Sequence, residues 1–86
     1  MSVEYYRKRL IDLRAQVAKE REAKKKDNER YAGYIKSASS PSSKASYRKQ
    51  KIDRAASHDR QIESLKRQIE SAKDSLARER AAAKRK

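Results

Sequence analysis

Apolar residues recur at alternating intervals of three and four residues near the start of the chain, and again just before residue 37. The apolar members of this first stripe are Val3, Tyr6, Leu10, Leu13, Val17, Tyr31 and Tyr34. Between them the same spacing falls on Glu20, Lys24 and Asp27, so the middle of the stripe is charged. This heptad pattern predicts a helix over residues 1–36, with Ser2 as its N-cap.

A second stripe of the same kind occupies the last third of the chain. Its members are Ile62, Leu65, Ile69, Ala72 and Leu76. Towards the N-terminus it continues through His58, Ala55 and Lys51, with Ile52 beside it. The pattern predicts a second helix over residues 42–86. Its stripe is polar in the half that follows residue 42 and apolar in the half that ends the chain.

The run of helix-forming residues is interrupted between Ser37 and Lys44, a stretch that we call the elbow. This stretch holds five serines and the one proline of the chain. Clustered serines favour caps and turns, and Ser40 followed by Pro41 is a natural N-cap and first helical position. We therefore expect a turn over residues 37–41 and a single all-α domain, a two-helix antiparallel coiled-coil hairpin.

Folding the chain about this turn brings the two apolar segments together when facing residue numbers sum to roughly 79–80. Val17 then meets Ile62, Leu13 meets Leu65, Leu10 meets Ile69, Tyr6 meets Ala72 and Val3 meets Leu76. Tyr31 and Tyr34 are expected to meet Tyr47 and Ile52. The charged stretches coincide too, with Glu20 facing Arg60 and Asp27 facing Arg54. The expected hairpin has an apolar segment at each end and a charged segment, the waist, between them at about residues 20–27 and 53–60.

The core of such a hairpin is thin, because the chain has only eleven large aliphatic side chains. We therefore expect it to associate, as a dimer in a four-helix arrangement or with another helical protein. The expected interface residues are Val3, Tyr6, Leu10, Leu13, Val17, Tyr31, Tyr34, Ile52, Ile62, Leu65, Ile69 and Leu76. Function is then that of a non-catalytic oligomerisation or scaffold module.

The net charge of +13 offers a second interpretation. A basic chain attracts nucleic acid or another anionic surface without sequence specificity. The candidate contacts are Arg7, Lys8, Arg9, Lys24, Lys25, Lys26, Lys84, Arg85 and Lys86. No helix-turn-helix, zinc-finger or basic-zipper pattern accompanies them, and the charge is spread over both helices, as on a solvated surface.

Candidate chemistry is sparse. His58 is the single histidine and there is no cysteine, so no metal-ligand spacing is present. No phosphate-binding glycine loop, catalytic carboxylate pair or nucleophile motif occurs. We expect no enzyme activity, no cofactor and no small-molecule substrate, and we interpret His58 as a waist residue that tunes helix pairing. Without a signal peptide or an apolar run of membrane-spanning length, a cytoplasmic location is expected.

The elbow and the helix after it carry a resemblance. The run Ile35-Lys36-Ser37-Ala38-Ser39-Ser40-Pro41-Ser42-Ser43-Lys44, followed by Ile52-Asp53-Arg54 and a charged arm, resembles the N-terminal coiled-coil region of bacterial TIR-domain proteins. The similarity covers roughly residues 30–80. It implies a module that assembles protomers in an anti-phage defence or signalling system. This chain contains no TIR domain, so the resemblance brings no NAD-cleaving residue with it.

A helical hairpin of this length also looks like the small partner proteins of type VII secretion. Those proteins carry a Trp-x-Gly turn, and this chain contains no tryptophan. The resemblance implies an adaptor that pairs with another helical protein.

Overall fold

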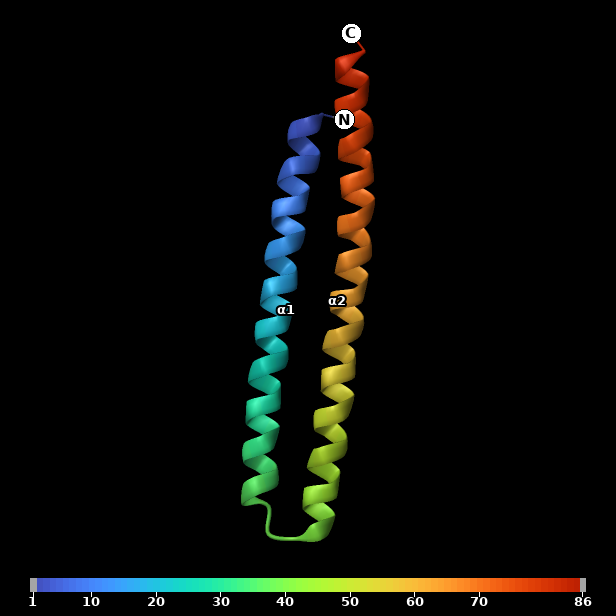
Figure 1. Cartoon of the computed structure of the whole chain (residues 1–86). Coiled ribbons are helices and arrows are strands. Elements are labelled where there is room, and N and C mark those ends of the chain that lie inside the picture. Colours follow the sequence, from blue (N-terminus) through green and yellow to red (C-terminus); the bar gives the residue numbers. More distant parts are fainter. Residues whose placement is uncertain (1, 86) are drawn as a thin grey trace.

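The fold is an elongated antiparallel helical hairpin (Figure 1). A computed structural model describes residues 2–85, in which α1 spans Val3–Ser37 and α2 spans Pro41–Lys84. The hairpin measures 70 × 14 × 12 Å, and the end of α2 extends beyond the start of α1 (Figure 1). This confirms the all-α two-helix hairpin. Neither helix has a stretch of the length and apolarity that crossing a membrane requires.

Serine side chains start both helices. Ser2 Oγ accepts a hydrogen bond from the backbone N–H of Tyr5 at 3.2 Å, and Ser40 Oγ accepts one from Ser43 at 3.1 Å. Ser40 has extended backbone angles and Pro41 begins α2, where its missing N–H costs nothing. The connection is therefore shorter than the expected turn, because both Ser37 and Pro41 are helical and only residues 38–40 lie between the helices.

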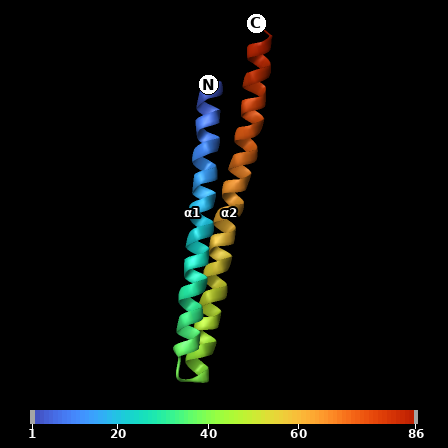
Figure 2. The ribbon, with the colours of Figure 1, turned by 60° about the vertical axis from the view of Figure 1, so that its left-hand side comes forward.

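The apolar core lies towards the end of the hairpin that carries the two termini, the open end. Figure 2 shows this end opposite the connection between α1 and α2. It consists of Leu10, Leu13, Val17, Ile62, Leu65, Ala72 and Leu76, all buried. Leu13 is the most enclosed at 1% exposed, and Val3, Tyr6 and Ile69 pack against the cluster. The two apolar segments thus meet across the seam, meaning the contact surface between α1 and α2, as their heptad patterns predict.

Three tyrosines pack beside the elbow. The ring of Tyr47 lies 6.4 Å from that of Tyr31 and 5.3 Å from that of Tyr34, between ring centroids. Tyr31 is buried and Tyr34 is 43% exposed. Ile52, which we expected beside these tyrosines, is 68% exposed. It follows the stripe residue Lys51, and one residue turns a helical side chain by about 100°.

Candidate functional site

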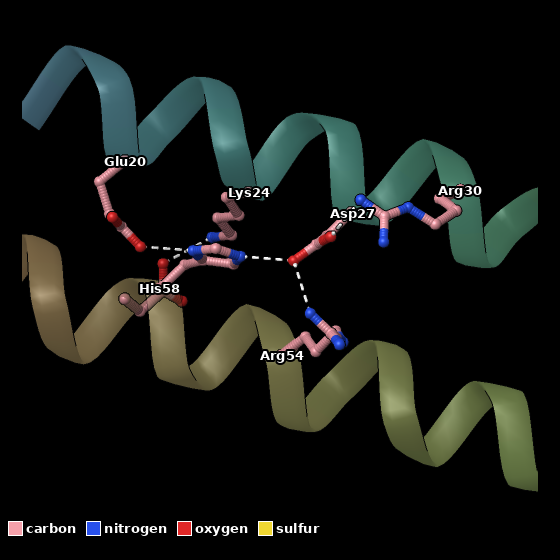
Figure 3. Close-up of polar contacts among 7 residues, drawn as sticks. Glu20, Lys24, Asp27, Arg30, Arg54 and His58 are labelled. Atoms are coloured by element: carbon pink, nitrogen blue, oxygen red, sulfur yellow. Dashed lines mark hydrogen bonds and ion pairs between the residues drawn. The ribbon is translucent and has the colours of Figure 1, made fainter.

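His58 of α2 lies between two carboxylates of α1 (Figure 3). Its Nδ1 atom is 2.5 Å from Oε1 of Glu20, and its Nε2 atom is 2.6 Å from Oδ2 of Asp27. Ionised carboxylates only accept hydrogen bonds, so both ring nitrogens must donate, which a neutral imidazole cannot do. The arrangement therefore holds His58 as an imidazolium ion that bridges α2 to two carboxylates about two turns apart on α1.

The electrostatics agree with this protonation state. The hydrogen bond to Asp27, followed by the one to Glu20, raises the pKa of His58 above its ordinary value of 6.5, against the opposing effect of burial. The hydrogen bond from His58 lowers the pKa of Asp27 below its ordinary value of 3.8, and the charges of Arg54 and Arg30 act in the same direction. Each group thus stabilises the charged form of the other.

Asp27 is the centre of the network. Its side chain is only 9% exposed, and it contacts Arg30 at 3.2 Å and Arg54 at 3.5 Å as well as His58 (Figure 3). The pairing of Asp27 with Arg54 expected from the heptad register is confirmed.

The expected pairing of Glu20 with Arg60 is wrong, since Glu20 binds His58 instead. Arg60 is exposed because it lies two residues past His58 and so points about 200° away from the seam. His58 contacts Glu20 because it lies on the stripe that faces α1, whereas Arg60 lies off that stripe.

The polar waist, meaning Glu20, Lys24, Asp27, Arg54, His58 and Asp59, joins α1 to α2 through hydrogen bonds and ion pairs. Lys24 Nζ binds Asp59 Oδ1 across the seam at 2.6 Å, so this predicted anion contact is paired within the hairpin. Within residues 2–85, no group of three or more metal-ligating side chains could hold an ion. Both carboxylates facing His58 are engaged in hydrogen bonds between the two helices, so the arrangement links α1 to α2.

Most of the predicted interface residues are used within the chain. Leu10, Leu13, Val17, Tyr31, Ile62, Leu65 and Leu76 are buried between α1 and α2, with Val3, Tyr6 and Ile69 partly buried beside them. Tyr34 and Ile52 are the two that remain largely exposed. A partner would therefore contact side chains outside the hairpin seam, and the apolar stripe alone does not identify them.

The predicted anion-binding residues do not form one patch. Arg7 lines a groove on one side of the seam, while Arg9 lines a groove on the other side and donates to Gln68 at 3.5 Å. Lys8, Lys25 and Lys26 are exposed on α1. Lys84 and Arg85 are exposed at the end of α2, and Lys86 lies outside the described residues.

One side of the hairpin carries two open grooves. The groove near the open end has a volume of about 530 Å³ and is lined by Arg7, Leu10, Ile11, Arg14, Lys73, Leu76, Ala77 and Arg80. The groove near the elbow, of about 390 Å³, is lined by Asn28, Ile35, Arg48, Lys51, Ile52 and Ala55. Ile11 in the first and Ile52 in the second are 65% and 68% exposed.

Seven-residue steps join these grooves into one surface. On α1 the steps run through Arg7, Arg14, Arg21, Asn28 and Ile35, and on α2 through Arg80, Lys73, Lys66, Asp59 and Ile52. A step of seven keeps a side chain on one side of a coiled coil, so both rows run along the same side of the seam. We call this surface the row face. Its sequence signal is the heptad spacing of basic residues beside the apolar stripe.

Comparisons with protein-family models, with curated proteins and with solved structures find no match for this chain.

Proposed function

We propose that this chain is a non-catalytic coiled-coil assembly module that packs its row face against further helices. The observation that carries the proposal is the exposure of Ile11 and Ile52 above grooves whose floors are apolar. Isolated exposed aliphatic residues are ordinary, but two on one side of a hairpin, each within a groove, favour an interaction surface. Helices that pack on a groove between two others complete a bundle.

The simplest occupant is a second copy, which would give the four-helix arrangement expected from the sequence. Two copies would bring their basic rows close together, so repulsion opposes this association at low ionic strength. Salt screens such charges, and at about 1 M the screening length falls to about 3 Å. Self-association should therefore strengthen as salt rises, opposite to the behaviour of a complex held by charge attraction.

Sedimentation equilibrium over a range of protein concentrations tests the proposal. We expect the wild-type chain to shift from monomer towards dimer in about 1 M sodium chloride, where the charges are screened. The double variant Ile11→Ser with Ile52→Ser should stay monomeric under the same conditions and keep its helix content, because neither side chain belongs to the core. A matched control changes Ala15 and Gln61, exposed residues outside both grooves, to serine.

Two results would contradict self-assembly through this surface. One is a wild-type chain that remains monomeric at every concentration and salt. The other is a dimer that forms equally well in the Ile11 and Ile52 double variant, which would place the interface elsewhere.

The biological setting is a separate part of the proposal. The resemblance at residues 35–44 supports an assembly role within a bacterial TIR-type defence or signalling system. The coding sequence that flanks this stretch in its genome tests this directly. A TIR domain encoded in the same reading frame would support it, and an unrelated domain in that place would contradict it.

A further inference from the structure

We infer that the row face is a docking site for an acidic amphipathic helix of a partner protein, which would complete a three-helix coiled coil. The inference rests on the proposed assembly function and names the chemistry of the preferred partner. Three observations support the inference: the charge of the row face, the apolar residues that line its grooves, and the location of the tyrosines outside these grooves.

In the half of the row face nearer the chain termini, the row residues are all positively charged. The first three members of each row are basic, which gives six cations, and four of these six line the groove near the open end. The six cations are Arg7, Arg14 and Arg21 on α1, and Arg80, Lys73 and Lys66 on α2. In an antiparallel pair these rows lie beside each other across the seam, and like charges in such positions destabilise the pairing. An anionic occupant would turn this repulsion into attraction.

Few acidic side chains neutralise these cations. Among the residues that the structure describes, Arg14, Arg21, Lys66 and Arg80 form no ion pair. Arg7 pairs with Glu4 at 3.3 Å and Lys73 pairs with Glu70 at 3.4 Å. Both pairs lie within one helix and are largely exposed, so they are weak and easily exchanged for a partner's carboxylates.

The floor of the row face requires more than negative charge. Leu10, Ile11, Leu76 and Ala77 line the outer groove, and Ile35, Ile52 and Ala55 line the one near the elbow. Ile11 and Ile35 are about 24 residues apart on α1, which corresponds to about 36 Å of helix. An occupant of both grooves is therefore a helix of about 24 residues with an apolar stripe flanked by Asp or Glu.

Nucleic acid fits this surface less well. Stacking on aromatic side chains is the usual means of holding single-stranded bases. Tyr5 and Tyr6 line a groove on the other side of the seam, with Arg9 and Gln68. Tyr31, Tyr34 and Tyr47 pack on one another beside the elbow. No tyrosine lines either groove of the row face.

Binding of designed helical peptides to the full chain tests the inference. The probe has leucine at its stripe positions and glutamate beside them. One control peptide replaces the glutamates with lysine, and another keeps them but replaces the leucines with glutamine. A single-stranded oligonucleotide labelled with the same dye forms the fourth arm. Fluorescence anisotropy at about physiological ionic strength, where the screening length is about 8 Å, should show binding of the first peptide alone in the micromolar range or tighter.

Charge reversal on the chain provides matched variants. Arg14→Glu with Arg21→Glu removes two row cations, and we expect it to weaken peptide binding about tenfold or more. Arg60→Glu with Arg67→Glu makes the same change in net charge on the outer side of α2 and should weaken binding no more than about twofold. In the free chain the row variant should melt no lower than wild type, because Arg14→Glu replaces repulsion with attraction to Lys66 and Lys73 and offsets the approach of Arg21→Glu to Asp59. A variant that melts no lower but binds less cannot owe its loss of binding to misfolding.

Several results would overturn the inference. Equal binding of the glutamine-substituted acidic peptide would show that only charge is recognised. Equal binding of the lysine peptide would show that charge is irrelevant. Oligonucleotide binding that the row variant abolishes, without peptide binding, would make the row face a nucleic-acid surface.

The outcome also separates this inference from the function on which it rests. If salt-dependent dimerisation through Ile11 and Ile52 occurs but the acidic peptide does not bind, assembly stands and the partner chemistry is wrong. If neither occurs, both fall. Peptide binding without any self-association would support the inference and limit assembly to a different partner.

Discussion

Two regions of the same seam hold the helices together by different means. In the apolar segment Leu13 is 1% exposed and is surrounded by other aliphatic side chains. In the polar waist His58 is 17% exposed and Glu20 is 26% exposed, and hydrogen bonds and ion pairs replace apolar contact. Apolar burial is strong and non-directional, whereas a bridging imidazolium requires particular partners at particular distances.

The difference separates stability from register. Sliding one helix by a heptad would still place several aliphatic residues against one another, such as Leu10 against Leu76 and Val17 against Ile69. The same slide would take His58 away from Glu20 and Asp27 and leave a largely buried carboxylate with fewer partners. We therefore expect the apolar segment to supply most of the free energy of folding and the waist to select one alignment, as polar residues do at inward positions of coiled coils.

The largest expected effect is in the apolar segment. Leu13→Ala should lower the free energy of unfolding by about 2–5 kcal/mol, since it removes a fully enclosed side chain and leaves a cavity. Chemical denaturation followed by far-UV circular dichroism measures the loss. Ile11→Ala, two residues away and largely exposed, should change it by no more than about 0.5 kcal/mol. Equal losses in the two variants would contradict the assignment of the core.

Replacing the waist with leucine should separate the two roles. We expect Glu20→Leu, Asp27→Leu and His58→Leu together to raise the melting temperature, because the desolvation cost of the charges disappears. The same variant should lose its unique register, which spin labels on α1 and α2 would report as a broadened distance distribution. A single narrow distance equal to that of the wild type would show that the apolar stripes alone define the alignment.

The waist also predicts a pH dependence that the apolar segment lacks. The raised pKa of His58 means that its contribution is fully present below pH 6.5 and is lost as pH rises through the raised value. The lowered pKa of Asp27 means that its contribution is present above pH 3.8 and is lost as pH falls through the lowered value. The melting temperature of wild type should therefore fall on going from pH 6 to pH 9.

His58→Gln is the matched variant for this titration, because glutamine keeps polar contact but cannot carry the charge. Its melting temperature should be lower than that of wild type at pH 6 and should change much less between pH 6 and pH 9. An equally steep decline in this variant would assign the pH dependence to other groups.

The smallest expected effect lies outside both regions, at the start of α2. Ser40→Ala removes the hydroxyl that accepts from Ser43 and should cost about 1 kcal/mol at every pH. Ser39→Ala is the matched control, since Ser39 caps no helix, and it should have little effect. Thermal unfolding at two pH values would show whether the loss is independent of the waist, as the structure predicts.

The sequence predicts the hairpin well because its signals are local and repeated. The three-four spacing places Leu10, Leu13 and Val17 on one stripe, and Ser40 with Pro41 marks the start of α2. Pairing residues by the sum of their numbers misses that Glu20 binds His58 rather than Arg60. The signal that could have identified this pair is the stripe itself, because His58 lies on the stripe and Arg60 does not.

The row face shows a different limit. Runs such as Arg7-Lys8-Arg9 are the most visible basic features of the chain, yet their side chains point to different sides of a helix. The rows that share one side are seven residues apart, and their meaning depends on knowing that α1 and α2 pack antiparallel. Heptad positions flanking the apolar stripe, compared between the two helices, are where that signal can be found.

The short elbow also determines the order in which the hairpin can form. Because only residues 38–40 separate the helices, contacts near the elbow join residues close in sequence, such as Tyr34 and Tyr47. The partners in the bond from Arg9 to Gln68 are 59 residues apart. Closing short loops costs the least entropy, so the chain should zip from the elbow through the waist to the open end. The most stabilising segment then forms last, and Leu13→Ala should speed unfolding while leaving the folding rate nearly unchanged.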